Sequence, residues 1–277
     1  MLPYEFITVY LSQSLELLHK LLAILDRKPK FPTTVKLIVA GSTGFVATEL
    51  IKQAISSPEI TSIIALARRK TSVPQTLDDN ADITKFGAVI CDDFSNYSES
   101  VKKGLEGADA CIWLIAITPS KMKDSTLDKA RKICVEYTVN GLEMITQLPR
   151  EKGARPFRFI YVSGHKSERD QSKQPWVMGD YLLMRGEAES RVIDFAQASN
   201  GAVEACIVKP GLIDGPDRRQ GLVGSVLSTI GRGLIGLPKV DVSQIAATLL
   251  EQALKGIEKE TLSNEDLIRI GDKVLSG

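Results

Sequence analysis

Residues 41–47 form a glycine-rich segment whose residue types suit a dinucleotide pyrophosphate. Such a group is bound where a tight turn brings backbone N–H groups close to it and a helix N-terminus adds partial positive charge. Gly41 can make the turn, Gly44 lets the backbone approach the phosphates, and the small Ala47 lets the helix lie close to the preceding strand. Ser42 and Thr43 add hydroxyl donors. The predicted cofactor-binding residues of this segment are Gly41, Ser42, Thr43, Gly44, Phe45 and Val46. The alternative is a plain turn between a strand and a helix, without a ligand.

Two adjacent arginines, Arg68 and Arg69, follow the second predicted strand. An NAD site usually has a carboxylate there for the ribose 2′-hydroxyl, whereas arginine accommodates the 2′-phosphate of NADP. No Asp or Glu occurs among residues 65–70, and a guanidinium offers forked donors that match phosphate oxygens. We therefore expect NADP(H) to be preferred over NAD(H); the alternative is a solvated basic run. Asp92 and Asp93 follow the third predicted strand, where they would accept from the adenine amino group or, equally, cap a turn.

These residues need a sheet to position them, and apolar runs that alternate with helical patterns predict one. Expected strands cover residues 35–40, 63–67, 88–91, 110–116, 157–163 and 203–208, with a short strand at 267–270. Expected helices cover a stretch from the end of the glycine segment at residue 47 to about residue 56, and residues 126–148, 181–198, 222–234 and 242–255. The glycine segment lies between the first strand and the first of these helices, which is the context of a dinucleotide fingerprint. The pattern predicts an α/β fold for residues 33–277: a Rossmann-like, doubly wound parallel sheet with a small C-terminal substrate lobe.

Composition excludes several classes of protein. The 277 residues hold 35 Lys and Arg against 34 Asp and Glu, so no basic field exists to bind nucleic acid. Two histidines and four widely spaced cysteines exclude a His-rich metal site and argue against a zinc module or a disulfide scaffold, so we expect no metal. The cysteine usage fits a reducing compartment, and a cytoplasmic location is expected.

Residues 1–32 are expected to form an extra, amphipathic N-terminal helix. Leucines recur there at steps of four and three, at Leu11, Leu15, Leu18, Leu22 and Leu25. The uncharged stretch from residue 6 to residue 15 is far shorter than the roughly 20 residues of a membrane span. We expect this helix to pack on its own domain or on a second copy in a homodimer. The alternative is a peripheral helix on a membrane surface.

Several motifs occur in an order that resembles a known family. They are the glycine segment, residues 66–69, Asp92-Asp93, residues 137–141 (YTVNG), residues 161–164 (YVSG), residues 181–189 (YLLMRGEAE) and residues 209–211 (KPG). Together they resemble atypical or extended short-chain dehydrogenases/reductases, in particular the NAD(P)-binding branch of Tat-interacting-protein-like and NmrA-like proteins. The resemblance covers about residues 35–254 and implies further cofactor contacts at Ile115, Ala116, Lys209 and Pro210.

The resemblance also implies a catalytic set. In the family, a tyrosine and a lysine four residues later form the acid–base pair, because the cation favours the phenolate. Here the tyrosine is Tyr181 and the cation is Arg185, which keeps the charge but does not release a proton. Ser163 corresponds to the serine that holds the substrate oxygen, although some relatives carry it one position later, where this chain has Gly164. Asn140 resembles the position that holds a relay water in the family.

Each of these assignments has a structural alternative. Arg185 would otherwise lie on a helix surface, Ser163 would cap a turn, and Asn140 would pack between helices. His165 follows two residues after Ser163; it would supply a proton or, more commonly for a lone loop histidine, serve the structure.

Three functions are therefore open. The leading hypothesis is an NADP(H)-dependent oxidoreductase that acts on a small or medium organic carbonyl or alcohol. The second keeps the fold without net hydride transfer, as an isomerase, dehydratase or cyclase. The third is a non-enzymatic protein that senses NADP(H) and controls a partner, as the resemblance to NmrA-like proteins implies.

Overall fold

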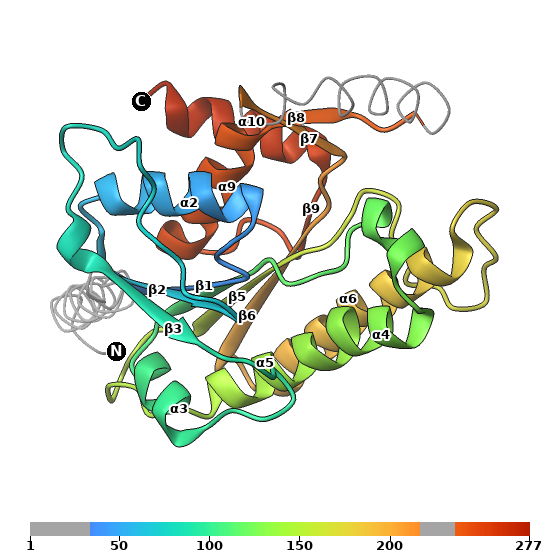
Figure 1. Ribbon diagram of the computed structural model, residues 1–277, viewed down its shortest axis with the longest axis horizontal. Coiled ribbons are helices and arrows are strands. Elements are labelled where there is room, and N and C mark those ends of the chain that lie inside the picture. Colours follow the sequence, from blue (N-terminus) through green and yellow to red (C-terminus); the bar gives the residue numbers. More distant parts are fainter. Residues whose placement is uncertain (1–33, 217–235) are drawn as a thin grey trace, which may run out of the picture. The chain divides into compact units, whose positions relative to one another are not determined.

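The computed structural model describes residues 34–216 and 236–277, and a parallel sheet of seven strands forms the centre of this part (Figure 1). The strand order is β3-β2-β1-β4-β5-β6-β9. The strands are β1 (Val35–Ala40), β2 (Ile60–Ala67), β3 (Phe86–Ile90), β4 (Ala110–Trp113), β5 (Phe157–Val162), β6 (Val203–Val208) and β9 (Thr261–Leu262). Every neighbouring pair is parallel. The expected Rossmann-like, doubly wound sheet is confirmed.

The order of the strands changes direction between β1 and β4. From β1 the chain moves outward through β2 and β3, and it then returns to pair β4 with the other edge of β1. Such a switch leaves a crevice at the carboxyl ends of the two strands, where ligands bind in open α/β sheets. The loops that follow β1, β4 and β5 therefore position the candidate site.

Helices cover both faces of the sheet (Figure 1). On one face lie α2 (Phe45–Ser56), α9 (Val242–Lys255) and α10 (Asn264–Leu275). Leu50, Ile245 and Leu267 from these helices belong to the same buried cluster as Leu37 of β1. The strands are apolar on both faces because helices bury both of them, which is why they appear in the sequence as continuous apolar runs.

The opposite face carries α3 (Glu99–Leu105), α4 (Leu127–Arg131), α5 (Tyr137–Thr146) and α6 (Gly179–Ala198). Its core is aromatic: Trp113 and Phe159 are fully buried with ring centroids 5.9 Å apart. The helix expected at 126–148 is divided here, because residues Lys132–Glu136 between α4 and α5 form a π-helical segment. A π segment in a helix often marks a functional region.

The short strand expected at residues 267–270 is wrong, because these residues lie within α10. Ser263 and Asp266 form a capping box that starts the helix, and Leu267 and Ile270, three residues apart, are both buried on one face. The last strand of the sheet lies just before this helix, at β9. A four-residue apolar run does not distinguish a strand from one turn of a buried helix face.

Other boundaries differ in smaller ways. The strand expected at 110–116 ends at Trp113, and the following residues to Ile117 form a loop. A second, two-stranded parallel sheet joins β7 (Leu212–Asp214) to β8 (Lys239–Asp241). The expected helix at 222–234 and the N-terminal extension at 1–32 lie outside the described residues. Among the described helices, none is long and apolar enough to span a membrane.

Candidate functional site

Gly41 occupies a position that only glycine fills without strain. Its φ angle is +86°, in the left-handed region. A Cβ atom on this residue would lie 3.1 Å from the backbone carbon of Leu114 and 3.2 Å from Cγ1 of Ile115. The turn after β1 therefore passes directly against the segment that follows β4, at the switch in strand order.

The N-terminus of α2 has no acceptor of its own. Its N-cap is Gly44, which has no side chain to cap the helix, and no acidic residue occurs in the first turn. By contrast, α3 and α10 are capped by the Ser98 and Ser263 hydroxyls and carry acidic residues in their first turns. The positive end of the α2 dipole is thus left for an external anion. This end and the close backbone turn at Gly41 fit a dinucleotide pyrophosphate.

Ser42 does not face the crevice with its hydroxyl. The side chain is 1% exposed, and its Oγ lies 2.6 Å from Oγ1 of Thr71. This bond joins the glycine turn to the loop that follows β2. Thr43, in contrast, is exposed, and Phe45 and Val46 are half-buried in the first turn of α2.

The ends of β2 and β3 carry the residues expected on the adenosine side. Arg68 and Arg69 are exposed directly after β2, and Asp92 and Asp93 are exposed after β3. The Asp93 carboxylate accepts the Ser95 N–H at 2.9 Å, which holds the pKa of Asp93 below its usual value. Asp93 therefore caps a turn, the alternative considered for it. Its carboxylate also accepts the hydroxyl of Tyr137, and burial together with this bond raises the pKa of Tyr137.

The segment after β4 connects the glycine turn to Tyr181. Ile115, which contacts the Cβ position of Gly41, and Ala116 are half-buried in this segment. Two residues beyond Ile115, the Ile117 carbonyl accepts the Tyr181 hydroxyl at 3.0 Å. The Ile117 N–H donates to Sγ of Cys134 in the π segment at 3.3 Å. The predicted dinucleotide turn and the predicted catalytic tyrosine therefore both contact one four-residue segment, 114–117.

Tyr181 and Arg185 are one helical turn apart on the face of α6 that meets the end of β5. Arg185 is 2% exposed, donates to the Val162 carbonyl at 2.8 Å, and lies 5.0 Å from the centroid of the Tyr161 ring. The alternative of a surface arginine therefore does not apply. Burial raises the pKa of Tyr181, and the charge of Arg185 opposes this rise.

Ser163 is bound to a buried carboxylate on the same helix face. Its hydroxyl donates to Oε1 of Glu189 at 2.6 Å, and Glu189 is completely buried. The other carboxylate oxygen accepts Arg169 Nε at 2.9 Å and Lys209 Nζ at 3.2 Å. Two cations and one hydroxyl thus satisfy this carboxylate, as burial of a charge requires.

Lys209 and Pro210 both hold the loop that follows β5. The Lys209 ammonium also donates to the Ser167 carbonyl at 2.6 Å, and the Pro210 carbonyl accepts the His165 N–H at 2.8 Å. Partial burial, with the charges of Lys166 and Lys209, lowers the pKa of His165. The imidazole is therefore uncharged at neutral pH and is a poor proton donor.

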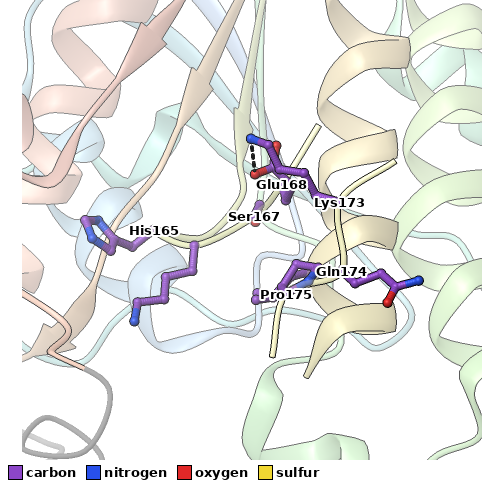
Figure 2. Close-up of a pocket in the computed structure, with 8 residues that line it drawn as sticks. His165, Ser167, Glu168, Lys173, Gln174 and Pro175 are labelled. Atoms are coloured by element: carbon purple, nitrogen blue, oxygen red, sulfur yellow. Dashed lines mark hydrogen bonds and ion pairs between the residues drawn. The ribbon is translucent and has the colours of Figure 1, made fainter. Parts of the chain in front are cut away.

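A pocket of about 600 Å³ opens between this loop and the first turn of α6 (Figure 2). Residues 165–168 and 173–175 line it, with Leu182 of α6. Figure 2 shows Ser167 between His165 on one side and Gln174 and Pro175 on the other.

Asn140 does not lie at this pocket. It lines a different hollow of about 470 Å³ with Ser95 and Lys102, and the two hollows share no lining residue.

Sequence reasoning gave no role to three residues of this site. Glu189 carried a signal, because it lies eight residues after Tyr181 and four after Arg185 and so shares their helix face. Thr71 and Ser167 carried none, since each is an ordinary loop residue until its partner is known. Among the described residues, no group of three or more His, Cys, Asp or Glu side chains could hold a metal ion.

No protein-family model matches the chain. Among curated proteins, one named "Protein FMP52, mitochondrial" from Candida albicans is 25% identical over 249 residues, which cover 85% of this chain and 98% of that protein. A protein of the same name from Coccidioides immitis is 22% identical over 251 residues, which cover 84% of this chain and 95% of that protein. Both are similar to this chain over nearly their whole length.

Solved structures share the fold. MoeE5 in complex with UDP-glucuronic acid and NAD has a TM-score of 0.59 at 16% identity and covers 82% of this chain and 75% of its own. UDP-glucuronic acid 4-epimerase from Bacillus cereus, in complex with UDP-glucuronic acid and NAD, has a TM-score of 0.56 at 14% identity, covering 87% and 83%. At these identities the likeness shows the Rossmann-like fold. The resemblance to short-chain dehydrogenases/reductases, including the NmrA-like branch, stays a prediction.

The expected cytoplasmic location is wrong by these comparisons, because both curated relatives are named as mitochondrial proteins. Cysteine usage indicated a reducing compartment, but it does not distinguish one reducing compartment from another.

Proposed function

We propose that the protein is an NADP(H)-dependent oxidoreductase that reduces a small or medium organic carbonyl compound. The observation that carries this proposal is the segment 114–117. It contacts Gly41 of the dinucleotide turn at one end and accepts the Tyr181 hydroxyl at the other. This contact supports the assignment of a proton donor and a pyrophosphate-binding turn to the carboxyl ends of β1 and β4, where doubly wound folds bind ligands.

The dinucleotide would be held by Gly41, Gly44 and the N-terminus of α2, with Arg68 and Arg69 on the adenosine side. When bound, a reduced nicotinamide supplies a hydride to a carbonyl carbon. The protein must then provide binding, orientation, exclusion of water and a proton for the carbonyl oxygen. We assign that proton to the Tyr181 hydroxyl, which in this structure donates to the Ile117 carbonyl.

The protonation state of Tyr181 suits the acid role in the proposed reduction. Because burial raises the pKa of its hydroxyl, Tyr181 is protonated at neutral pH. It is then an acid that can protonate the oxygen of a carbonyl during reduction. The opposing charge of Arg185 stabilises the phenolate that remains after transfer. The hydroxyl leaves the Ile117 carbonyl to reach the substrate, and that carbonyl is free to accept it again afterwards.

Titration and turnover with the full chain test the proposal. We expect NADPH to bind with a measurable heat and the wild type to oxidise NADPH with at least one compound of a carbonyl panel: propanal, benzaldehyde, cyclohexanone and 9,10-phenanthrenequinone. Tyr181→Phe should bind NADPH as the wild type does and lose at least about 10²-fold in turnover, the usual contribution of a positioned acid. A Tyr181→Phe variant that turns over at the wild-type rate would remove this residue from the mechanism.

One observation favours a second function, a dinucleotide-binding protein without turnover. The guanidinium of Arg185 contacts the Val162 carbonyl and the Tyr161 ring. These contacts engage it within the protein, whereas the lysine of the resembled family acts in catalysis. A protein of this kind would bind NADPH and reduce none of the four carbonyl probes.

We also propose a mitochondrial location, supported by the names of the two curated relatives. Cell fractionation of the native protein tests it. Recovery in the cytosolic fraction, with mitochondrial markers in the pellet, would contradict it.

A further inference from the structure

Ser167 lines the pocket beside α6, and we propose that its hydroxyl holds the oxygen atom of the substrate. The inference rests on the proposed carbonyl reduction and names the group that orients the substrate for it. The sequence favoured Ser163 for this task, but the structure gives that residue a different set of contacts.

Ser163 is not available to a substrate. Its hydroxyl donates to Glu189 at 2.6 Å, and the carboxylate is completely buried. A substrate oxygen that captured the Ser163 proton would leave a buried carboxylate oxygen without that donor, which is costly. The next residue, Gly164, has no side chain. The hydroxyl that meets the substrate must therefore come from another position.

The Ser167 hydroxyl lies beside residues 163 and 164, neither of which offers a free donor to a substrate. Its Oγ lies 3.0 Å from Oγ of Ser163 and 3.5 Å from the position that a Cβ atom on Gly164 would take. The Ser167 backbone is fixed on both sides, because its N–H donates to the Gly164 carbonyl at 3.1 Å and its carbonyl accepts Lys209 Nζ at 2.6 Å. These two bonds hold the Ser167 backbone in place, which favours preorganised binding of a substrate.

The chain from Glu189 through Ser163 to Ser167 serves both states of the substrate. A hydroxyl has one proton and two lone pairs. The Ser163 hydroxyl is the donor to Oε1 of Glu189 and to Oγ of Ser167, and the remaining lone pair of Ser167 accepts the O–H of an alcohol. Because Ser163 is the donor between the two serines, the Ser167 proton is available to a carbonyl oxygen while Ser163 keeps its bond to Glu189. Arg169 and Lys209 stay on Glu189 in either arrangement. Rotation alone changes the state, and no proton is gained or lost.

The position of Gly164 permits a relocation test. Gly164 is not among the residues with positive φ, so a side chain is compatible with its backbone. In Ser167→Ala, the space of the lost hydroxyl becomes open to a serine at residue 164, whose Cβ would lie 3.5 Å from it. Ser172→Ala is a matched control, because Ser172 is exposed in the same loop and does not line the pocket.

The experiment measures kcat/KM for the probe that the wild type reduces fastest with NADPH, and NADPH affinity by calorimetry. We expect Ser167→Ala to lose about 10²-fold, as removal of a donor to a reacting oxygen does, with unchanged NADPH affinity. Ser172→Ala should stay within about twofold, the range of a neutral surface change. Adding Gly164→Ser to Ser167→Ala should recover at least about tenfold of the loss.

Two results would overturn the inference alone: Ser167→Ala with the wild-type kcat/KM, or a relocated serine that restores nothing. If Ser167→Ala also loses NADPH affinity, the kcat/KM of the double variant decides: recovery supports the inference, and no recovery overturns it. A wild type that binds NADPH and reduces no probe would instead overturn the proposed reaction, and this inference with it.

Discussion

Arg68 and Arg69 are the residues to which we assign the proposed preference for NADP(H). Both are exposed directly after β2, the strand next to β3, whose end carries Asp92 and Asp93. A guanidinium there can bind the 2′-phosphate of NADP through charge-assisted hydrogen bonds, each worth about 1.5–3 kcal/mol. The solved structures that share the fold are described as holding NAD, so this edge is where a preference for NADP has to be tested.

We predict that Arg68→Gln with Arg69→Gln weakens NADPH binding by about tenfold or more, since a factor of ten corresponds to about 1.4 kcal/mol. NADH affinity should change by less than about twofold, because NADH has no 2′-phosphate and surface changes away from a contact have small effects. Calorimetric titration of both coenzymes measures this. Lys70→Gln, the next basic residue, is the control. Equal losses for the two coenzymes would contradict the assignment.

Arg185 shows how far a residue can be understood before its surroundings are known. The sequence placed a cation one turn after Tyr181, and the structure agrees that its charge opposes the rise in the pKa of Tyr181. The sequence did not reveal the contacts of the guanidinium, which are its bond to the Val162 carbonyl and its position over the Tyr161 ring. Those partners are distant in the sequence and meet Arg185 only through the packing of α6 on β5.

Among the elements, α6 controls the geometry of the site. The loop after β5 lies directly on this helix, and a Cβ atom on Gly186 would come within 1.7 Å of the Glu168 carbonyl oxygen and 2.6 Å of the Arg169 nitrogen. The Glu168 N–H also donates to the Leu182 carbonyl at 3.1 Å. Ser167 and Arg169 therefore keep their places only while α6 has no side chain at residue 186.

We predict that Gly186→Ala lowers the free energy of unfolding by at least about 2 kcal/mol, the cost of overpacking against backbone that cannot move aside. Gly179→Ala, at the start of the same helix, should be close to neutral, because its Cβ atom would meet only Pro175 Cδ at 3.8 Å. Urea unfolding of the two variants and the wild type measures the difference. Equal midpoints for the two variants would show that the loop does not rest on α6 as described.

The elements were predictable to the extent that their signals are local. β1, β6 and α9 match the expected ranges in full, because buried parallel strands are continuous apolar runs and α9 has an amphipathic pattern with the Asp241 capping box. The glycine turn was equally visible. The contact of Ser163 with Glu189 was not, since 26 residues separate them. The strand predicted at residues 267–270 was wrong because so short an apolar run fits a strand or one turn of a helix.

At the scale of the whole molecule, the two apolar layers hold the loops after β1, β4 and β5 at one edge of the sheet. Ion pairs add links between neighbouring helices. Glu187 of α6 accepts both Arg131 of α4 and Arg191, with Arg131 Nη2 and Arg191 Nη2 each 2.7 Å from its Oε1. The hydrogen bond from Arg131, and the charges of both arginines, hold the pKa of Glu187 below its usual value.

The sign of the pH dependence follows from that shift. The pKa of Glu187 is lower in the folded state than the value of about 4.3 in an unfolded chain. Its contribution to the free energy of unfolding is therefore complete above about pH 4.3 and is lost as the pH falls through the folded value. We predict that urea midpoints fall between about pH 7 and about pH 3.5, and that Glu187→Gln shows a smaller fall than the wild type because the group that takes up the proton is gone. Glu151→Gln removes the same charge from an exposed residue and should keep the wild-type slope. If both variants lose the same share of the acid sensitivity, the ion pair between α4 and α6 does not contribute to it. Other carboxylates with lowered pKa values, such as Asp266 between Lys259 and Arg269, then account for the effect.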